Sequence, residues 1–237
     1  TSEKRHFVDP SIATAIMRIR PEGVLNDFEY FGFLFCNLST YPLLCNMKRI
    51  AIFASGKGSN ADSLCSHLVN HASIEVALIL SDRKEAGVFA VAEKHHVQAI
   101  YLNKELLNNP DQVVALLKEH HIDVLVLAGY LKLVPHEWIA NYPGKIFNLH
   151  PALLPKFGGK GMYGMHVHRA VVAAGETETG ITIHEVNEHY DEGKILFQAR
   201  TAVEPTDSPE RVAEKIAALE KEHFARVITE VVEKLPL

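Results

Sequence analysis

Short apolar runs alternate with amphipathic stretches through most of this chain, and no other feature of the sequence constrains the fold as strongly. The runs fall at 50–54, 74–80, 97–102, 124–128 and 146–149, and helical patterns at 60–69, 86–95, 111–120 and near Pro135 lie between them. Strands that are apolar throughout are typical of parallel sheets covered on both faces. We therefore predict an α/β fold, a single doubly wound, Rossmann-like domain with a mostly parallel sheet and helices on both faces.

The C-terminal part departs from this pattern. Residues 180–186 and 195–201 alternate between apolar and polar and lie close together in the sequence, which predicts a hairpin or an edge pair. Residues 208–233 then have the period of a long amphipathic helix, with Ser208 as its N-cap ahead of Pro209. The parallel sheet should therefore end in an antiparallel pair and a closing helix.

Composition narrows the classes of function. The chain has 237 residues, 47% of them hydrophobic, and a formal net charge of −5. An acidic balance of this kind leaves no overall basic footprint for nucleic acid. The three cysteines, Cys36, Cys45 and Cys65, form no CxxC pair, which favours a reduced, cytoplasmic setting.

Residues 1–46 read differently from the rest of the chain. Their aromatic-rich run at 28–36 is interrupted by polar residues soon afterwards and falls short of the ~18–20 apolar residues of a membrane span. We predict that 1–46 is an N-terminal extension of unknown role outside the catalytic domain, which would occupy 47–237, and Met47 resembles a natural start. A functional anchor or a partner-binding arm is the alternative for this segment.

A glycine-rich turn follows the first predicted strand. The segment Ser55-Gly-Lys-Gly-Ser-Asn60 would present the free N–H groups of a helix start, which attract an anion. It is not a nucleotide P-loop, because GxxxxGK[ST] is absent. Gly56, Gly58 and Ala61 also fit the dinucleotide pattern, with Asp82 at about the spacing of a ribose-binding acid. A non-catalytic dinucleotide-binding regulator is therefore an alternative from a different class.

A second motif, Asn148-Leu-His150-Pro151, falls where the fifth predicted strand ends. Open α/β sheets bind ligands beyond the carboxyl ends of their strands, so this segment and the glycine turn should face one crevice. Asn148 and His150 are two residues apart and project to the same side of an extended chain. An amide that can donate to an oxyanion, beside an imidazole that can carry a proton, suits acyl transfer.

With these motifs together, the chain resembles the phosphoribosylglycinamide (GAR) formyltransferase family of folate-dependent enzymes. The resemblance rests on the ordered segments 55–60 (SGKGSN), 127–132 (LAGYLK), 148–155 (NLHPALLP) and 191–193 (DEG), and it extends from Met47 to the C-terminus. The 148–155 block is shared with the wider superfamily of formyltetrahydrofolate-using enzymes, and the glycine turn narrows the match to the GAR formyltransferase family. The resemblance implies transfer of a formyl group from 10-formyltetrahydrofolate, as donor co-substrate, to the amine of glycinamide ribonucleotide in de novo purine (IMP) biosynthesis.

The resemblance also implies roles for individual residues. The catalytic set of the family is matched by Asn148, His150 and Asp191. Residues that would bind the ribonucleotide are Gly58, Ser59, Asn60 and, in the last helix, Glu222. Residues that would line the folate pocket or close over the pterin are Leu131, Lys132, Leu133, Val134, His189 and Tyr190.

These assignments carry chemical expectations. Asp191 beside His150 would favour the imidazolium and raise the histidine pKa. No metal is expected, because His166 and His168 lack further ligands at metal-binding spacing. The partners expected are the two small-molecule substrates, with no nucleic acid and no membrane, and the protein would be a monomer or a homodimer.

Two rivals within the superfamily and one local departure stay open at this stage. Methionyl-tRNA formyltransferase usually carries a basic C-terminal RNA-binding domain and formyltetrahydrofolate hydrolase an N-terminal regulatory domain, and neither needs the glycine turn. The loop 158–164 is longer than in many relatives, and its Lys160 would either touch phosphate or lie in solvent. His166-Val-His168-Arg169 could reach the site, and the family has a matching His-x-His-Arg, but taken alone the segment is typical of a solvated helix start.

Overall fold

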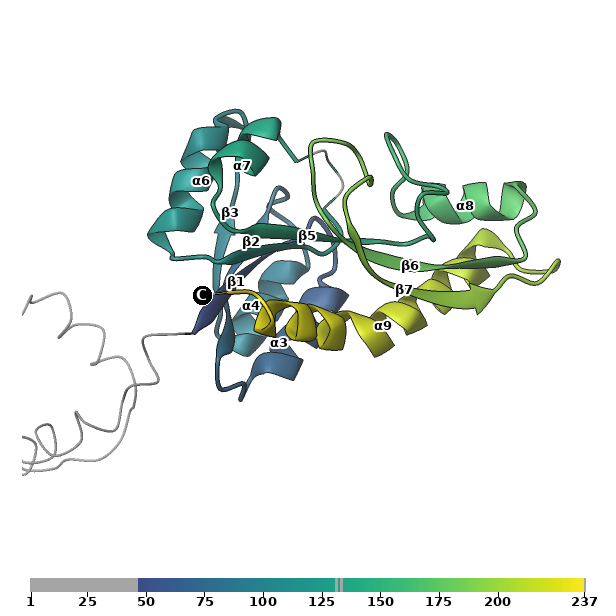
Figure 1. The fold of residues 1–237 in the computed structure, drawn as a ribbon, viewed down its shortest axis with the longest axis horizontal. Helices are drawn as coiled ribbons and strands as arrows, with labels where there is room; N and C mark the ends of the chain where they lie inside the picture. Colours follow the sequence, from purple (N-terminus) through teal and green to yellow (C-terminus); the bar gives the residue numbers. More distant parts are fainter. Residues whose placement is uncertain (1–46, 131, 133, 237) are drawn as a thin grey trace, which may run out of the picture. The chain divides into compact units, whose positions relative to one another are not determined.

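A seven-stranded sheet forms the centre of the molecule in the computed structural model, which describes residues 47–130, 132 and 134–236 (Figure 1). The expected extension at 1–46 lies outside the described residues. The strand order is β3-β2-β1-β4-β5-β6-β7. The strands are β1 (Lys48–Phe53), β2 (Ile74–Ser81), β3 (Gln98–Tyr101), β4 (Val124–Leu127), β5 (Lys145–His150), β6 (Glu178–Glu185) and β7 (Ile195–Ala202).

Strand direction reverses on either side of β6. The pairs among β1 to β5 are parallel, whereas β6 pairs antiparallel with both β5 and β7. The predicted mostly parallel sheet with a C-terminal edge pair is therefore confirmed. The antiparallel pairing of β5 with β6 has a local consequence for the site, because it sets His184 directly opposite Asn148.

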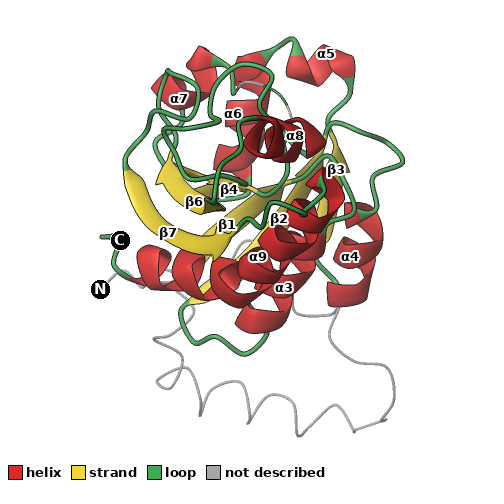
Figure 2. Ribbon diagram, turned by 90° about the vertical axis from the view of Figure 1, so that its right-hand side faces the viewer, coloured by secondary structure: helices red, strands yellow, loops and turns green. Residues whose placement is uncertain are grey.

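Helices cover both faces of the sheet, as the sequence pattern predicts. Figure 2 shows α3, α4 and α9 on one side of the strands and α6 and α7 on the other. The helices are α3 (Ser59–Leu68), α4 (Val88–His95), α5 (Lys104–Leu107), α6 (Pro110–Glu119), α7 (His136–Asn141), α8 (Met165–Ala173) and α9 (Pro209–Glu233). Within the part of the chain that the structure describes, no helix is long and apolar enough to cross a membrane.

Two separate hydrophobic cores result, one on each face. Along β1, Ile50 and Ile52 point into the core shared with α3, α4, α8 and α9, whereas Ala51 and Phe53 point into the core beneath α6 and α7. This is the two-residue alternation of an extended strand. Because both faces of β1 are covered, its residues 50–53 are all fully buried, which explains the continuous apolar run in the sequence.

The site lies at the switch point of this sheet. The chain leaves β1 for β2 and β3 on one side and returns to β4 on the other, so the carboxyl ends of β1 and β4 diverge and open a crevice. The glycine turn follows β1 and the segment 128–134 follows β4. The two motifs therefore enter one crevice because of the strand order.

A buried lysine joins the first strand to the end of the last helix. The Nζ of Lys48 donates to three backbone carbonyl oxygens, those of Val232 at 2.9 Å, Glu233 at 2.8 Å and Leu235 at 2.7 Å. The last carbonyls of a helix have no intrahelical partner and carry the negative end of the helix dipole. Lys48 therefore satisfies the C-terminus of α9 and fixes it to the sheet.

We expect Lys48→Met to lower the free energy of unfolding by about 2 kcal/mol, because three carbonyl groups lose a charged donor. Urea denaturation followed by circular dichroism measures this change. The matched control is Arg211→Gln, which removes an exposed Arg211–Glu214 pair and should change stability by less than about 0.5 kcal/mol. Equal effects of the two substitutions would show that the Lys48 contacts do not stabilise the fold.

Candidate active site

A cleft of about 570 Å³ opens at the switch point. Its walls come from the glycine turn, the segments after β4 and β5, the end of β6 with the loop that follows it, and one residue of α9. The residues predicted from the sequence that line it are Gly58, Ser59, Asn60, Lys132, Val134, Asn148, His150, His189, Tyr190 and Asp191. Leu131 and Leu133, also assigned to the folate pocket, lie outside the described residues.

The glycine turn is shaped by the close approach of α4, which begins at Val88. Gly58 has φ +84°, and a Cβ at this position would lie 2.9 Å from the Cα of Val88. Only glycine avoids both the strain and the collision. The turn directs the first N–H groups of α3 into the cleft, and this arrangement attracts an anionic group such as a phosphate.

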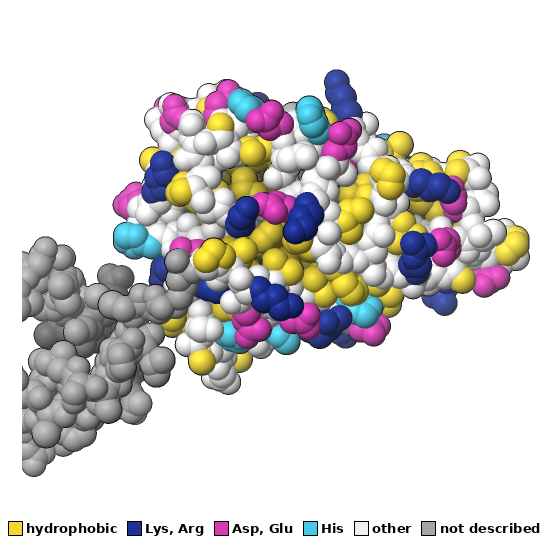
Figure 3. Space-filling view, in the orientation of Figure 1, with side chains coloured by type: hydrophobic (Ala, Val, Ile, Leu, Met, Phe, Trp, Pro, Cys, Tyr) yellow, Lys and Arg dark blue, Asp and Glu magenta, His cyan; other side chains and the backbone are white. Residues whose placement is uncertain are grey.

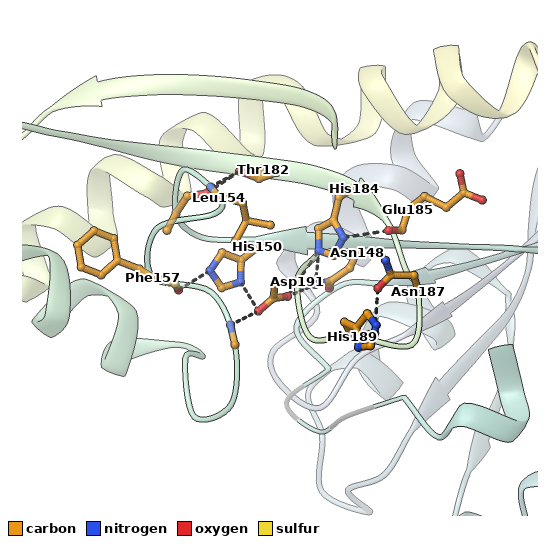
Figure 4. A network of polar contacts seen from close by, with 12 residues as sticks. Asn148, His150, Leu154, Phe157, Thr182, His184, Glu185, Asn187, His189 and Asp191 are labelled. Carbon is orange, nitrogen blue, oxygen red and sulfur yellow. Dashed lines mark hydrogen bonds and ion pairs between the residues drawn. The ribbon is translucent and has the colours of Figure 1, made fainter. Parts of the chain in front are cut away.

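Asn148, His150 and Asp191 meet in the cleft (Figure 4). The Nδ1 of His150 lies 3.5 Å from Oδ2 of Asp191, and the Nδ2 of Asn148 lies 3.5 Å from its Oδ1. His150 is 3% exposed. One carboxylate therefore faces both the amide and the imidazole, which come from β5 two residues apart.

The loop after β5 holds this group through its backbone. The Nε2 of His150 donates to the carbonyl oxygen of Phe157 at 2.8 Å, and the amide of Gly159 donates to Oδ2 of Asp191 at 2.9 Å. A Cβ on Gly158 would lie 2.6 Å from the Cδ2 of Leu154 and 3.1 Å from the Cβ of Asp191. These contacts explain the glycine at 158, and a φ of +96° explains the one at 159; the sequence marked both only as part of an unusual loop.

The expected rise in the pKa of His150 is wrong. Burial disfavours the charged ring and lowers the His150 pKa below its usual 6.5, and this outweighs the opposing effects of the Asp191 carboxylate and the Phe157 carbonyl. For Asp191, burial alone would raise the carboxyl pKa. The nearby imidazoles of His184 and His150 and the amide of Gly159 reverse this and hold it below 3.8.

Of the two interpretations of its segment, His168 follows the one in which it reaches the site. It belongs to α8, as part of the segment predicted to be a solvated helix start, but it is 6% exposed and lines the cleft. Its Nδ1 is buried without a hydrogen-bond partner among the described residues. Burial, and to a smaller extent the charge on His150, lower the pKa of His168.

Glu222 does not lie where the resemblance implied. Its side chain is 71% exposed, next to His223, and it is absent from the cleft wall. Glu220, two residues earlier on α9, is half-buried, lines the cleft and accepts a hydrogen bond of 3.0 Å from the Nδ2 of Asn60. Burial raises the pKa of the Glu220 carboxyl, although Asn60 opposes the rise. Glu222 therefore does not line the cleft, and helical phase with the buried Phe224 and Ile228 puts Glu220 on the face of α9 that does.

Asp82, the acid of the dinucleotide alternative, is occupied by another side chain. Its carboxylate is only 3% exposed and pairs with the Nζ of Lys132 at 2.8 Å. The pKa of Asp82 is lowered: burial would raise it, but the contact with Lys132 prevails. Asp82 thus anchors the segment after β4 and is not free to accept from a ribose hydroxyl.

The face of the molecule drawn in Figure 3 is of mixed charge. In the view of Figure 3, Lys and Arg side chains alternate with Asp and Glu. Among the described residues no three His, Cys, Asp or Glu side chains are grouped so that they could hold a metal ion. The polar residues that could act on a ligand are therefore those of the cleft.

An amide, an imidazole and a carboxylate meet beside a helix start, and such groups suit acyl-transfer chemistry. Comparison with known proteins agrees with this chemistry. The sequence profile described as formyl transferase matches residues 48–228. The chain belongs to this formyl transferase family.

Several relatives of this chain are named phosphoribosylglycinamide formyltransferase. A chloroplastic phosphoribosylglycinamide formyltransferase of Arabidopsis thaliana is 36% identical over 79% of this chain. The phosphoribosylglycinamide formyltransferase of Bacillus subtilis is 31% identical over 78% of this chain. This chain spans 95% of the Bacillus protein, but only 66% of the Arabidopsis protein and 61% of the Vigna unguiculata one.

Solved structures of proteins with this name, or with the name glycinamide ribonucleotide transformylase, also match. The phosphoribosylglycinamide formyltransferase of Bacillus halodurans is similar with a TM-score of 0.69 and 36% identity, over 79% of this chain and 96% of that one. Glycinamide ribonucleotide transformylase 1 of Geobacillus kaustophilus matches with a TM-score of 0.70 and 32% identity, over 79% and 100%. The likeness covers the whole of the doubly wound domain.

The two buried histidines predict a fall in stability with acidification. The folded protein disfavours the charged forms of His150 and His168, so the unfolded chain binds more protons near their ordinary pKa of 6.5. The free energy of unfolding should therefore fall between about pH 7.5 and pH 5.5. Urea denaturation at several pH values measures this fall.

The matching variant is His168→Gln, which removes one of the two groups. We expect it to show a smaller fall over this pH range than the unsubstituted protein, whatever its stability at about pH 7.5. Other titrating groups are common to both proteins and cancel in the comparison. Identical pH dependence would contradict a neutral, buried His168.

Proposed function

We propose that this protein transfers the formyl group of 10-formyltetrahydrofolate to the amine of glycinamide ribonucleotide, a step of de novo purine biosynthesis. The observation that carries the proposal is the presence of Asn148, His150 and Asp191 in one cleft with an anion-binding helix start. A phosphorylated amine substrate needs both parts. Family membership and the shared name of the relatives support the same reaction.

The reaction exchanges one carbon–nitrogen bond for another. The amine nitrogen bonds to the formyl carbon, the bond from that carbon to N10 of the folate breaks, and one proton passes from the amine to N10. The formyl oxygen becomes negative in between. An N–H of Asn148 stabilises this oxyanion, and preorganised donors of this kind are among the largest contributions to acyl-transfer catalysis.

His150 and Asp191 handle the proton. The Nε2–H of His150 is already donated to Phe157, so its Nδ1, which faces Asp191 at 3.5 Å, is the nitrogen available to accept a proton. The resting imidazole is neutral because burial lowers its pKa. It can therefore take a proton released by the attacking amine, with Asp191 stabilising the imidazolium until the proton reaches N10.

The two substrates would occupy different walls of the cleft. We assign the phosphate of the ribonucleotide to the turn Gly58, Ser59 and Asn60, and its ribose hydroxyls to Glu220 in place of Glu222. The folate would lie against the segment after β4, with Lys132 and Val134, and under the loop with His189 and Tyr190. The Asp82–Lys132 pair supports this wall by fixing the segment to the end of β2.

Two further aspects of function are also proposals. The cytoplasmic setting follows from the cysteine pattern, whereas the two plant relatives are named as chloroplastic. A monomer or a homodimer remains the expected assembly.

The reaction itself is tested by the release of tetrahydrofolate, followed by absorbance, with and without glycinamide ribonucleotide. We expect release that depends on the ribonucleotide, and a fall in kcat by about 10²-fold or more in Asn148→Ala and in His150→Ala. Release without the ribonucleotide would point instead to a hydrolase. Unchanged turnover in the two variants would remove these residues from the mechanism.

The assignment on α9 is tested by a pair of substitutions two residues apart. Glu220→Gln should raise the KM for glycinamide ribonucleotide by about tenfold, because a charged acceptor of the ribose hydroxyls is lost, and leave the KM for the folate unchanged. Glu222→Gln should change neither constant. The reverse order of effects would restore the assignment to Glu222.

A further inference from the structure

His184 is a buried side chain of the cleft to which the reaction proposed above gives no role. It is 2% exposed and lies directly across the antiparallel β5–β6 pair from Asn148 (Figure 4). Its two ring nitrogens contact different partners. Nδ1 lies 3.1 Å from the carbonyl oxygen of Glu185, and Nε2 lies 3.1 Å from the Nδ2 of Asn148.

The carbonyl of Glu185 determines which ring nitrogen carries the proton. A carbonyl oxygen can only accept, so the Nδ1 of His184 must donate and is protonated. This carbonyl is held in place, because the amide of Glu185 donates to Lys194 at 2.9 Å and a Cβ on Gly193 would lie only 1.6 Å from the carbonyl oxygen. The glycine of the DEG segment therefore keeps the space in which this contact forms.

The charge of the cluster argues for a neutral His184. Among the described residues Asp191 is the only carboxylate within 4.0 Å of His150 or His184, and one carboxylate can balance one imidazolium. His150 requires that balance during proton transfer. His184 Nε2 lies 3.6 Å from Asp191, too far for a good hydrogen bond, and 3.1 Å from Asn148.

A neutral ring with a protonated Nδ1 has a lone pair on Nε2, and this lone pair decides how the amide of Asn148 is turned. The oxygen and nitrogen of an amide side chain have nearly the same shape, so only their hydrogen-bond partners distinguish the two orientations. Nε2 accepts one N–H of Asn148. The second N–H is held only loosely, by Asp191 at 3.5 Å, and is free to donate to the formyl oxygen.

We propose that His184 is a positioning residue that acts as a fixed acceptor, its protonated Nδ1 held by the Glu185 carbonyl and its Nε2 keeping an N–H of Asn148 directed at the reacting oxygen. The catalytic part of this inference rests on the proposed formyl transfer. Without the acceptor, the amide of Asn148 can turn over and present its oxygen to the developing negative charge.

The protonation state is tested without any substrate. In the full chain labelled with ¹⁵N-histidine, the signals of His184 are assigned by their loss in a His184→Gln variant. We expect the chemical shifts of a neutral ring with Nδ1 protonated and Nε2 unprotonated. A protonated Nε2, in either the other neutral form or the imidazolium, would overturn the inference even if formyl transfer is found.

The effect on catalysis is tested by two variants that each keep half of the ring's contacts. His184→Asn puts a donor near the position of Nδ1 and has no acceptor at Nε2, whereas His184→Gln can place an amide oxygen near Nε2. We expect kcat to fall by about 10²-fold in His184→Asn and by less than tenfold in His184→Gln, with both KM values nearly unchanged.

The outcomes of the two tests separate the two proposals. Equal losses in both variants, or losses confined to KM, would overturn the positioning role even with the expected protonation state. Absence of formyl transfer in the unsubstituted protein would refute the proposed function and leave the spectroscopic result standing. If His184→Asn does not fold, the spectrum of the unsubstituted protein and the activity of His184→Gln still decide.

Discussion

One buried carboxylate organises the chemistry of this molecule. Asp191 faces His150, His184 and Asn148 and accepts from the amide of Gly159. Removal of a charge from water is unfavourable unless partners surround it, and here the N–H groups of Gly159 and Asn148 donate to the carboxylate while the two imidazoles lie beside it. The same contacts that stabilise the carboxylate also fix the amide and the imidazole, so the electrostatic requirement of burial and the geometric requirement of catalysis are met by one arrangement.

The change of strand direction makes this arrangement possible. The chain leaves β5, passes through α8 and returns along β6 in the opposite direction. This antiparallel pairing puts His184 opposite Asn148 within the sheet, where directly opposed side chains lie close together. The connection from β6 to β7 then brings Asp191 back beside both residues. The hairpin at the sheet edge is therefore part of the site.

Much of the fold could be predicted from the sequence, because hydrophobic patterning is local. Runs such as 124–128 are apolar throughout because helices cover both faces of the sheet. In the edge pair, β7 is partly exposed, whereas in β6 the alternating polar residues Thr182 and His184 are buried. The meeting of the glycine turn with Asn148 and His150 also followed from topology alone. Family resemblance added Asp191, which lies 43 residues from Asn148 in sequence, and no spacing rule would have linked the two.

The parts of the site that the sequence could not predict depend on tertiary contacts. The balance between burial and a neighbouring charge at His150 is decided by how deeply the ring lies, which no motif encodes. The choice between Glu220 and Glu222 is decided by which face of α9 is turned to the cleft. Phase counting from the buried Phe224 and Ile228 could have made that choice, whereas matching by motif did not.

Backbone groups explain the remaining difference between the site expected from the sequence and the site in the structure. The tautomer of His150 is fixed by the carbonyl of Phe157, that of His184 by the carbonyl of Glu185, and one oxygen of Asp191 by an amide. A backbone carbonyl or amide is present at nearly every position of a chain. The residues whose backbone supplies these contacts can therefore have almost any side chain, and no motif marks them. What the sequence does record is the space that the contacts need, as Gly158 beside Leu154 and Gly193 beside the Glu185 carbonyl. In this family the glycines near a motif therefore indicate where the backbone takes part in orienting catalytic groups.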